Sequence, residues 1–433
     1  MEASIEFPKY DSYKDSEIPW IGDIPTKWEK VKAKWLFTKI DRPVRAEDDV
    51  VTAFRDGQVT LRKNRRTEGF TNALKEHGYQ GIRKGDLVIH AMDAFAGAIG
   101  VSDSDGKSTP VYSACIPRGE FYTNTKYYAY LLRYMALSGY INSLAKGIRE
   151  RSTDFRFSDF SDLILPNPSE AEQDRIVNFL DQKTAEIDAA IAKKQELIQL
   201  LNEQKTILIN RAVTKGLNPN VKMKDSGVAW IGETPEHWRV CSLSHTASIT
   251  TGATPDRTNP NYWNGTIPWI KTGEVKFSNI ESSEEYISEL GLKHSAARLA
   301  PAETLLMAMY GQGVTRGRVG ILKVPAAFNQ ACAAIIVKKE LSTNYAFYFL
   351  YAAYPFIRDA GNETSQMNLS SGYIAKIKVL VPPEDEQNKI VSYCRELQTE
   401  YANIEQLQVD EIKALQEFKQ SLIAHATTGK IKV

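Results

Sequence analysis

Cationic side chains gather in two short stretches of the first half of the chain. Arg62-Lys63-Asn64-Arg65-Arg66 places four cations within five residues, just after an expected turn at Asp56-Gly57, and Lys146, Arg149 and Arg151 follow an expected aromatic helix. Lysine and arginine neutralise phosphates, and arginine and asparagine also pair with the edges of nucleic-acid bases. Each residue taken singly is equally consistent with an ordinary solvated loop, because charged loops are common on protein surfaces.

The second half carries a different polar set in the corresponding loops. One group lies in a glycine-rich turn and the other follows a second aromatic helix. The members of the two groups are Tyr310, Gln312, Arg316 and Arg318, then Gln366 and Asn368. A common frame with unlike loops is how one scaffold would recognise two unlike targets. We therefore predict that these loops, with those of the first half, contact nucleic acid.

Two motifs come close to those of S-adenosylmethionine-dependent methyltransferases. Asp93-x-Phe95-x-Gly97-x-x-Gly100 has the spacing of a cofactor loop, and Asn259-Pro260-Asn261-Tyr262 differs by one residue from NPPY. A cofactor loop leads from a strand into a helix, whereas Gly100 is followed by Val101, a polar turn and Pro110. The second half has another glycine-rich turn at the same place, which favours a structural hairpin in both.

Other catalytic patterns are also incomplete. Gly100 to Ser108 has one residue too many for a phosphate-binding loop, and Thr109-Pro110 blocks the helix that such a loop requires. Asp181-x-Lys183 lacks a second acid and is typical of a solvated helix face. The six histidines include no HExxH motif and no close pair. The sequence therefore predicts no catalytic residue and no metal ligand.

Composition and charge are those of an ordinary soluble globular protein. The length of 433 residues predicts two or more domains, and the net charge of +1 means that a surface attracting nucleic acid has to be local. The four cysteines are far apart and form no CxxC pair, so a zinc ribbon or a disulfide framework is not indicated. The N-terminus lacks a signal-peptide core, and no run of about 18 apolar residues occurs. We expect a cytoplasmic protein without a membrane partner.

A repeat with a period of about half the chain organises the sequence. Residues 14–28 and 224–238 share Lys-Asp-Ser, Trp-Ile-Gly, a proline and a final tryptophan in the same register. A second repeat pairs the stretch from Pro168 to Gly216 with that from Pro382 to Gly429, with identical residues at a constant offset of 214. We infer that the chain has internal, cyclic pseudo-twofold symmetry.

The second repeat predicts two long helices. Both stretches are rich in Ala, Leu, Glu, Gln and Lys, with Ser169 as a start signal and Gly216 as a stop signal. The apolar seam of the first helix consists of Ile187, Ala190, Ile191, Leu197, Ile198, Leu201 and Leu208. A helix of about 45 residues is roughly 65 Å long. Two such helices would cover each other's seam as an antiparallel pair, with apolar residues such as Ile198 left on the outer face for partners.

Each half has the same order of elements before its long helix. A strand, a glycine-rich turn, a second strand, an aromatic helix (126–143 and 344–359) and a short strand ending in proline follow one another. The mixture predicts an α/β or α+β fold. We expect two globular target-recognition domains separated by two long antiparallel helices, a coiled coil. The predicted segments are 1–165, 166–216, 217–380 and 381–433.

These features together resemble the specificity subunit of Type I restriction–modification systems. The resemblance rests on the paired Trp-Ile-Gly stretches, on the P-x-x-x-E-Q-x-x-I-V start of both long helices, and on Asn329-Gln330-Ala331-Cys332-Ala333, and it covers essentially the whole chain. It implies that residues 30–165 and 240–380 each read one half of a split, asymmetric DNA site. The first half has Tyr112-Ser113-Ala114-Cys115 where the second half has the Asn-Gln-Ala-Cys motif, so the two half-sites should differ.

The resemblance also implies partners and cofactors. Two modification (methyltransferase) subunits would dock on the helices that set the spacer, and restriction (translocase-nuclease) subunits would join them. S-adenosylmethionine would then sit on the modification subunits, and ATP and Mg²⁺ on the restriction subunits. This chain would hold no cofactor and would not be an enzyme.

Two other functions stay open at this point. A DNA adenine methyltransferase with degenerate motifs would bind S-adenosylmethionine without partners. A coiled-coil scaffold that never touches DNA would leave cellular methylation unchanged when its gene is deleted.

Overall fold

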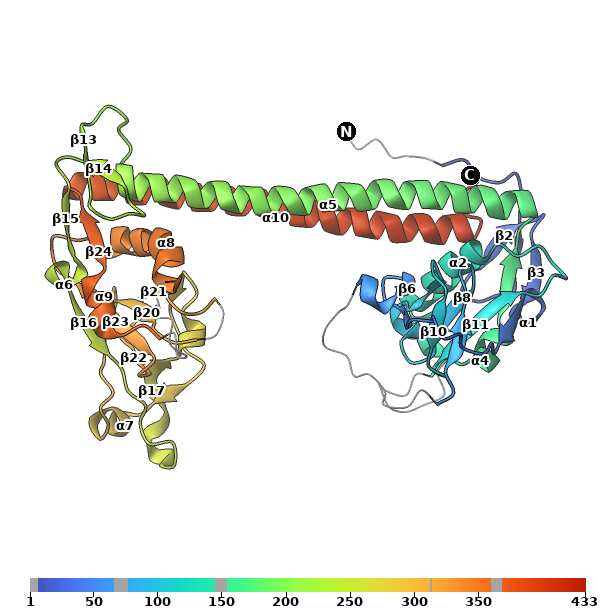
Figure 1. Cartoon of the computed structure of the whole chain (residues 1–433), viewed down its shortest axis with the longest axis horizontal. Coiled ribbons are helices and arrows are strands. Elements are labelled where there is room, and N and C mark those ends of the chain that lie inside the picture. Colours follow the sequence, from blue (N-terminus) through green and yellow to red (C-terminus); the bar gives the residue numbers. More distant parts are fainter. Residues whose placement is uncertain (1–6, 66–76, 145–153, 312–313, 360–367) are drawn as a thin grey trace. The chain divides into compact units, whose positions relative to one another are not determined.

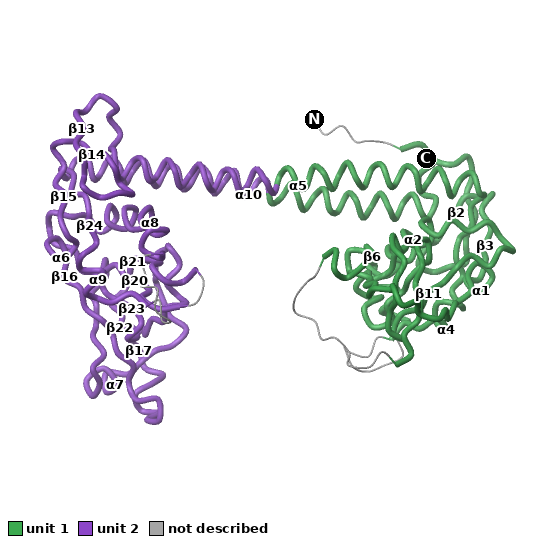
Figure 2. The backbone as a smooth tube through the Cα atoms, viewed as in Figure 1, with its two compact units in different colours: residues 1–194, 409–433 green, residues 195–408 purple. Residues whose placement is uncertain are grey.

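The computed structural model describes residues 7–65, 77–144, 154–311, 314–359 and 368–433. The chain forms two compact units, one of residues 1–194 and 409–433 (unit 1) and one of residues 195–408 (unit 2), coloured separately in Figure 2. Each unit combines one globular domain with a part of both long helices. The predicted segment boundaries, which give each long helix a segment of its own, stay a prediction.

The two long helices are α5, Glu170–Lys215, and α10, Glu384–Thr427, as the repeat predicts (Figure 1). Acidic residues fill the first turn of both, where they stabilise the positive end of the helix dipole. Gly216 and Gly429 follow the last turns with φ of +75° and +72°, a conformation that favours glycine. The start and stop signals therefore lie where the sequence places them.

Within unit 1 the first part of α5 runs antiparallel to the last part of α10. Asp188 pairs with Lys419 at 2.7 Å, and Lys194 pairs with Glu411 one and a half turns further along α5. Since the partner number falls as the α5 number rises, the two helices run in opposite directions. Ile187 belongs to the same buried cluster as residues of the last turns of α10, so the predicted antiparallel pairing is confirmed.

Unit 2 contains the other ends of the two helices. Ile209 and Val213 of α5 share a buried cluster with Leu397 and Tyr401 of α10. One member of the predicted seam is wrong: Leu197 is 41% exposed. The 3–4 spacing assigns a residue to a face of the helix, but the partner helix covers only part of that face.

The globular domain of unit 1 is built on a four-stranded antiparallel sheet in the order β4-β11-β8-β9. Its strands are β4 Phe37–Ile40, β8 Leu87–His90, β9 Ile99–Val101 and β11 Tyr112–Pro117. The remaining strands form two-stranded pairs: β1 Tyr13–Asp15 with β2 Asp23–Pro25, β3 Glu29–Lys32 with β12 Ile164–Asn167, β5 Val51–Ala53 with β6 Val59–Leu61, and β7 Gln80–Ile82 with β10 Gly106–Ser108. The helices are α1 Ala33–Leu36, α2 Thr125–Leu137, α3 Tyr140–Ser143 and α4 Phe157–Ser161, with short 3-10 turns η1 Arg62–Asn64 and η2 Ala94–Ala96.

Unit 2 repeats this sheet as β16-β23-β20-β21, extended by β18. These strands are β16 Ala247–Thr251, β18 Asn279–Ile280, β20 Leu305–Ala308, β21 Val319–Leu322 and β23 Cys332–Val337. A second sheet has the order β19-β17-β22, with β17 Trp263–Ile270, β19 Tyr286–Ile287 and β22 Ala327–Phe328. Two pairs complete the strands: β13 Met223–Asp225 with β14 Glu233–Pro235, and β15 Arg239–Ser242 with β24 Lys378–Val381. The helices are α6 Leu243–Thr246, α7 Glu289–Lys293, α8 Thr343–Asp359 and α9 Ser371–Lys376, with η3 Pro260–Tyr262 and η4 Thr272–Glu274.

The two domains thus share a mixed α/β frame and differ in what is added to it. The glycine-rich stretch of the first half joins β8 to β9, which pair antiparallel, and Gly97 has a φ of +92°. The predicted hairpin is therefore confirmed, and the stretch does not lead into a cofactor-binding helix. Unit 1 adds the hairpin β5-β6, whereas unit 2 adds the second sheet.

The ends of the long helices meet the repeated tryptophan stretch in the same way in both units. In unit 2 a Cβ on Gly216 would lie 3.1 Å from the Trp238 ring, and in unit 1 a Cβ on Gly429 would lie 3.0 Å from the Trp28 ring. The chain end after α10 also bonds to the N-terminal segment, since the Lys432 amide donates to the Pro8 carbonyl at 2.7 Å. The cyclic symmetry inferred from the sequence is therefore present in the contacts of each unit.

A buried glutamine ties each domain to the start of its long helix. In unit 1 the Gln173 carboxamide accepts from the Asn124 amide at 2.9 Å and donates to the Tyr122 and Pro168 carbonyls. In unit 2 Gln387 accepts from the Ser342 amide at 2.7 Å and donates to the backbone in the corresponding places. Asn124 and Ser342 precede α2 and α8, so the same side chain fixes the aromatic helix of each domain.

A buried tyrosine adds a second anchor in each unit. The Tyr127 hydroxyl of α2 donates to the Thr427 carbonyl of α10 at 2.8 Å, and the Tyr345 hydroxyl of α8 donates to the Val213 carbonyl of α5 at 2.9 Å. The glutamine lies on the helix that follows the domain, and the tyrosine reaches the other helix. Each domain is therefore fastened to both long helices.

We expect Gln173→Met to lower the free energy of unfolding by about 2–4 kcal/mol, because buried backbone groups that lose their partner cost about 1–3 kcal/mol each. Chemical denaturation of the full chain measures the change. Gln182→Met is the matched control: this exposed side chain on the same helix bonds only to Glu186, and its replacement should stay within about 0.5 kcal/mol. Equal losses in the two variants would contradict the anchoring role.

Candidate nucleic-acid interface

Of the predicted cations of the first half, those that the structure describes lie at the hairpin of β5 and β6, and residues 49–65 are called the basic hairpin here. Val51 and Val59 of the two strands are buried, and they hold the hairpin on the domain. The turn between the strands contains Asp56 and Gly57, with Gly57 at a φ of +90°, as the sequence predicts. The hairpin is labelled by β6 in Figure 1.

Two predicted DNA-contacting cations are ion-paired within the hairpin. Lys63 pairs with Asp49 at 2.5 Å. The Arg65 guanidinium lies 4.4 Å from the centre of the Phe54 ring and reaches Asp56 at 2.6 Å. Both side chains therefore fold back onto the hairpin while they remain at its surface.

The other two described members of this group are held by threonines. Arg62 donates to the Thr52 hydroxyl at 3.3 Å, and the Asn64 amide donates to the Thr60 hydroxyl at 2.9 Å. Arg62, Lys63, Asn64 and Arg65 are thus all held at the end of β6, and their contacts with DNA stay a prediction. The other predicted residues of this half, which lie outside the described residues, are Arg66, Lys146, Arg149 and Arg151.

The ion pair with Lys63 also acts on the titration of its partner. The Lys63 ammonium, through its hydrogen bond and its charge, lowers the pKa of Asp49 from the usual value of an aspartate. Since an ordinary aspartate is already ionised well below neutral pH, Asp49 is a carboxylate under physiological conditions. The negative charge beside Lys63 is therefore permanent.

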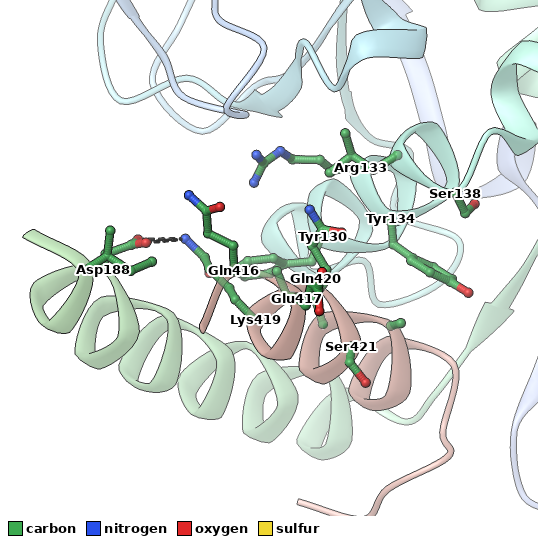
Figure 3. A pocket seen from close by; sticks show the side chains of 14 residues that line it. Tyr130, Arg133, Tyr134, Ser138, Asp188, Gln416, Glu417, Lys419, Gln420 and Ser421 are labelled. Carbon is green, nitrogen blue, oxygen red and sulfur yellow. Dashed lines mark hydrogen bonds and ion pairs between the residues drawn. The ribbon is translucent and has the colours of Figure 1, made fainter. Parts of the chain in front are cut away.

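A groove of about 660 Å³ lies beside the hairpin in unit 1, between α2, α5 and α10 (Figure 3). Arg133 extends from α2 along its wall, and Asp188 and Lys419 face each other across the helices. A Cβ on Gly57 would lie 2.6 Å from the Arg133 Cδ. The φ of +90° at Gly57 favours glycine, and the short approach shows that Arg133 of α2 lies against the tip of the basic hairpin.

The glycine-rich turn of unit 2 is organised differently. Arg316 is only 7% exposed, and its guanidinium donates to the Arg358 carbonyl near the end of α8. The Arg318 Nε is buried as well. Tyr310 and Asn368 are exposed, while Gln312 and Gln366 lie outside the described residues. The predicted DNA contacts of this set stay predictions, and the burial of Arg316 favours a structural role.

Unit 2 also holds a cation–aromatic cluster that the sequence analysis missed. The Arg257 guanidinium lies 4.0 Å from the centre of the Trp263 ring and 5.0 Å from that of Trp269, and it pairs with Glu285 at 2.5 Å. The register of β17 shifts between Trp263 and Ile267, so alternation along the strand did not reveal that the two rings meet. Lys271 pairs with the same acid at 3.0 Å.

Known proteins show the same architecture. A family model of the Type I restriction modification DNA specificity domain matches residues 235–414. The EcoR124I/EcoR124II specificity subunit of Escherichia coli is 29% identical over 144 residues, 32% of this chain and 36% of that protein. The HindI specificity subunit of Haemophilus influenzae is 24% identical over 269 residues, 59% of this chain and 57% of that protein. Residues 235–414 therefore match the specificity domain of Type I restriction–modification systems, and the chain is similar to specificity subunits of that family.

Another specificity subunit, MjaIX of Methanocaldococcus jannaschii, is 26% identical over 37% of this chain and 38% of that protein. The alignments with it and with the Escherichia coli protein thus span little more than a third of the relatives' length. A solved chain from a study of assembly and conformational transition in the type I R-M system matches with a TM-score of 0.71 at 14% identity, covering 93% of this chain and 98% of that one. The HsdS subunit from Thermoanaerobacter tengcongensis matches with a TM-score of 0.54 at 15% identity, covering 94% and 98%. These matches show a shared fold.

In the part of the chain that the structure describes, no group of three or more His, Cys, Asp or Glu side chains could hold a metal ion, and none of the helices combines the length and the apolar character needed to cross a membrane. All four cysteines are buried and unpaired. Burial raises the pKa of Cys115, Cys332 and Cys394 to about 12, so these thiols are not poised as nucleophiles.

We expect Arg316→Met to destabilise unit 2 by about 1–3 kcal/mol, because the Arg358 carbonyl loses the hydrogen bond from the buried Arg316 guanidinium. Thermal unfolding of the full chain measures this. Lys323→Met is the control: Lys323 pairs with Glu303 at 2.8 Å on the surface, and exposed pairs contribute about 0–1 kcal/mol. Weaker DNA binding by Arg316→Met without any loss of stability would show instead that Arg316 reads DNA directly.

Proposed function

We propose that this chain is the DNA-recognition subunit of its restriction–modification complex, and that each globular domain reads one half of a bipartite, asymmetric site. The observation that supports this most directly is the pairing of equal anchors with unequal surfaces. Gln173 and Gln387 make equivalent hydrogen bonds in the two domains, whereas the basic hairpin of unit 1 and the Arg257–tryptophan cluster of unit 2 are built differently. Two domains that are attached in the same way but present different contact surfaces suit an asymmetric DNA site.

In this proposal the long helices set the spacer between the half-sites. At 1.5 Å per residue, the 46 residues of α5 make a helix of roughly 69 Å. A helix gains or loses length only in steps of its rise, and rotates by about 100° with each added residue. A change of whole turns would therefore alter the spacer while keeping each domain's anchor on the same face.

The modification subunits would dock on apolar side chains that the helix pair leaves uncovered. Leu197, Leu200 and Ile207 are 41%, 53% and 66% exposed, and they lie within an arc of about 80° on α5 at 3.6 residues per turn. Leu407 of α10 is also exposed. Exposed apolar groups that share a face mark sites of protein association. The sequence analysis named Ile198 for this surface, but Ile198 is half-buried. The proposed docking surface therefore consists of the exposed residues Leu197, Leu200 and Ile207.

The chemistry would then reside on the partners. The modification subunits would bind S-adenosylmethionine, and restriction subunits, where they join, would bind ATP and Mg²⁺. This chain would supply sequence recognition and the geometry of assembly.

Exchange of residues 30–165 for the corresponding domain of another specificity subunit should change one half of the methylated motif and leave the other half intact. Methylome sequencing of cells carrying the exchanged gene measures this. Deletion of the gene is the reference, and it should remove one two-part adenine-methylation motif. A change in both half-sites would contradict the assignment of one half-site to each domain, and an unaltered methylome on deletion would contradict the function.

The double variant Leu200→Gln, Ile207→Gln should weaken association with the modification subunits about thirty- to a thousandfold, since each apolar side chain buried in an interface contributes about 1–2 kcal/mol and every 1.4 kcal/mol is tenfold in affinity. Sedimentation of the purified subunits measures the affinity. Leu290→Gln, at a similarly exposed leucine of α7, is the control and should assemble normally. Normal assembly by the double variant would show that the modification subunits dock on a different surface.

A further inference from the structure

The cations of the basic hairpin share one feature beyond their number: an aspartate stands against each of three of them. Lys63 faces Asp49 and Arg65 faces Asp56, as described above. Arg55, in the same turn, pairs with Asp93 at 2.9 Å. The three acids come from different places, since Asp49 precedes β5, Asp56 lies in the turn, and Asp93 follows β8. Each of them pairs with a cation of the basic hairpin.

These pairs contribute little to folding. The side chains of Lys63 and Asp49 are 64% and 58% exposed, and those of Arg55 and Asp93 are 68% and 36% exposed. Exposed pairs stabilise proteins by about 0–1 kcal/mol, because water screens the attraction and the long side chains lose conformational freedom. The arrangement matters more for what the cations can bind next.

A carboxylate beside a lysine or arginine competes with a DNA phosphate for the same cation. Binding of a free cation to a phosphate is driven by release of counterions and does not depend on sequence. When a lysine or arginine must first break its ion pair with an aspartate, the net free energy gained by binding a phosphate is smaller. The aspartate therefore lowers the affinity of the hairpin for any DNA backbone. Base contacts compensate for this lost affinity only at the specific site.

We propose that Asp49, Asp56 and Asp93 are specificity-determining residues that suppress binding of the basic hairpin to nonspecific DNA. The proposal rests on the DNA-recognition function proposed above. It assigns these acids a role opposite to that of the cations around them: they weaken binding overall and thereby raise the ratio of specific to nonspecific affinity.

The same arrangement recurs in unit 2 with different residues. Arg257 is held by Glu285, and Lys271 is held by Glu284 and Glu285, each at 3.0 Å. Since the two domains share a frame but not these loops, the recurrence is not inherited from a common sequence motif. Both surfaces thus hold cations in ion pairs with nearby carboxylates.

The test uses the full chain assembled with its modification subunits, and compares wild type with the triple variant Asp49→Asn, Asp56→Asn, Asp93→Asn. The probe is a labelled duplex of mixed sequence without the motif that the methylome defines. We expect affinity for this duplex to rise roughly three- to tenfold for each released cation at 0.1 M salt, and the slope of log K against log salt to steepen by up to about 0.9 per cation. Affinity for a duplex carrying the motif should rise less.

Glu17→Gln is the matched control. Glu17 pairs with Lys30 at 2.7 Å on the surface of the same unit, outside the hairpin, so the variant also removes one acid from an exposed pair. Its affinity for the mixed-sequence duplex should equal that of wild type. Asparagine and glutamine keep the size of the acids, and unchanged thermal unfolding confirms that every variant is folded.

Three results would contradict the proposal. If wild type binds both duplexes and the triple variant does not differ from it, the aspartates have no such role, while the recognition function stands. If Glu17→Gln gains as much per charge as the triple variant, the effect is one of net charge alone. If the wild-type complex binds neither duplex, the recognition function itself fails, and this inference fails with it.

Discussion

The structure depends on the hydrogen bonds of a buried carboxamide. Gln173 and Gln387 are almost fully buried, and each serves the backbone before an aromatic helix and the backbone at the start of a long helix. A buried amide left without partners costs more than most surface interactions contribute. The domain and its helix therefore have one low-energy arrangement. The tyrosine bonds to Thr427 and Val213 extend this constraint to the second helix.

Because these anchors use α2, α8 and the ends of the long helices, they leave the opposite parts of each sheet free to vary. The four shared strands keep their order in both domains, while the additions differ: a hairpin in unit 1 and a second sheet in unit 2. Variation in a loop that no anchor uses does not change the position of the domain on its helices. This separation of mounting from reading lets one scaffold carry unlike recognition surfaces.

The repeat made most of the frame predictable. Identical residues at a fixed offset gave both long helices, their ends and the cyclic closure, and the strand–turn–strand order gave the β8–β9 hairpin. What the sequence could not give was the partner of each side chain. Arg316 looked like a surface cation, but it is buried because its turn packs against the end of α8. Leu197 fitted the helical seam, but its exposure depends on where the partner helix lies. The aspartate partners of Lys63 and Arg65 come from across the hairpin and from its tip, at distances in sequence that no local pattern specifies.

The near-neutral net charge of the chain has a structural counterpart in the ion pairs on these surfaces. A net charge of +1 could reflect a surface with few cations, yet the proposed DNA-contacting surfaces contain Arg55, Lys63 and Arg65 in unit 1 and Arg257 and Lys271 in unit 2. They are neutralised at close range, by carboxylates about 2.5–3.0 Å away. Such a surface has a weak field at a distance but a dense set of donors on contact. Long-range attraction is the same for every DNA sequence, whereas donors at contact distance distinguish bases. The pairing of charges therefore shifts the balance of the interface from attraction toward discrimination.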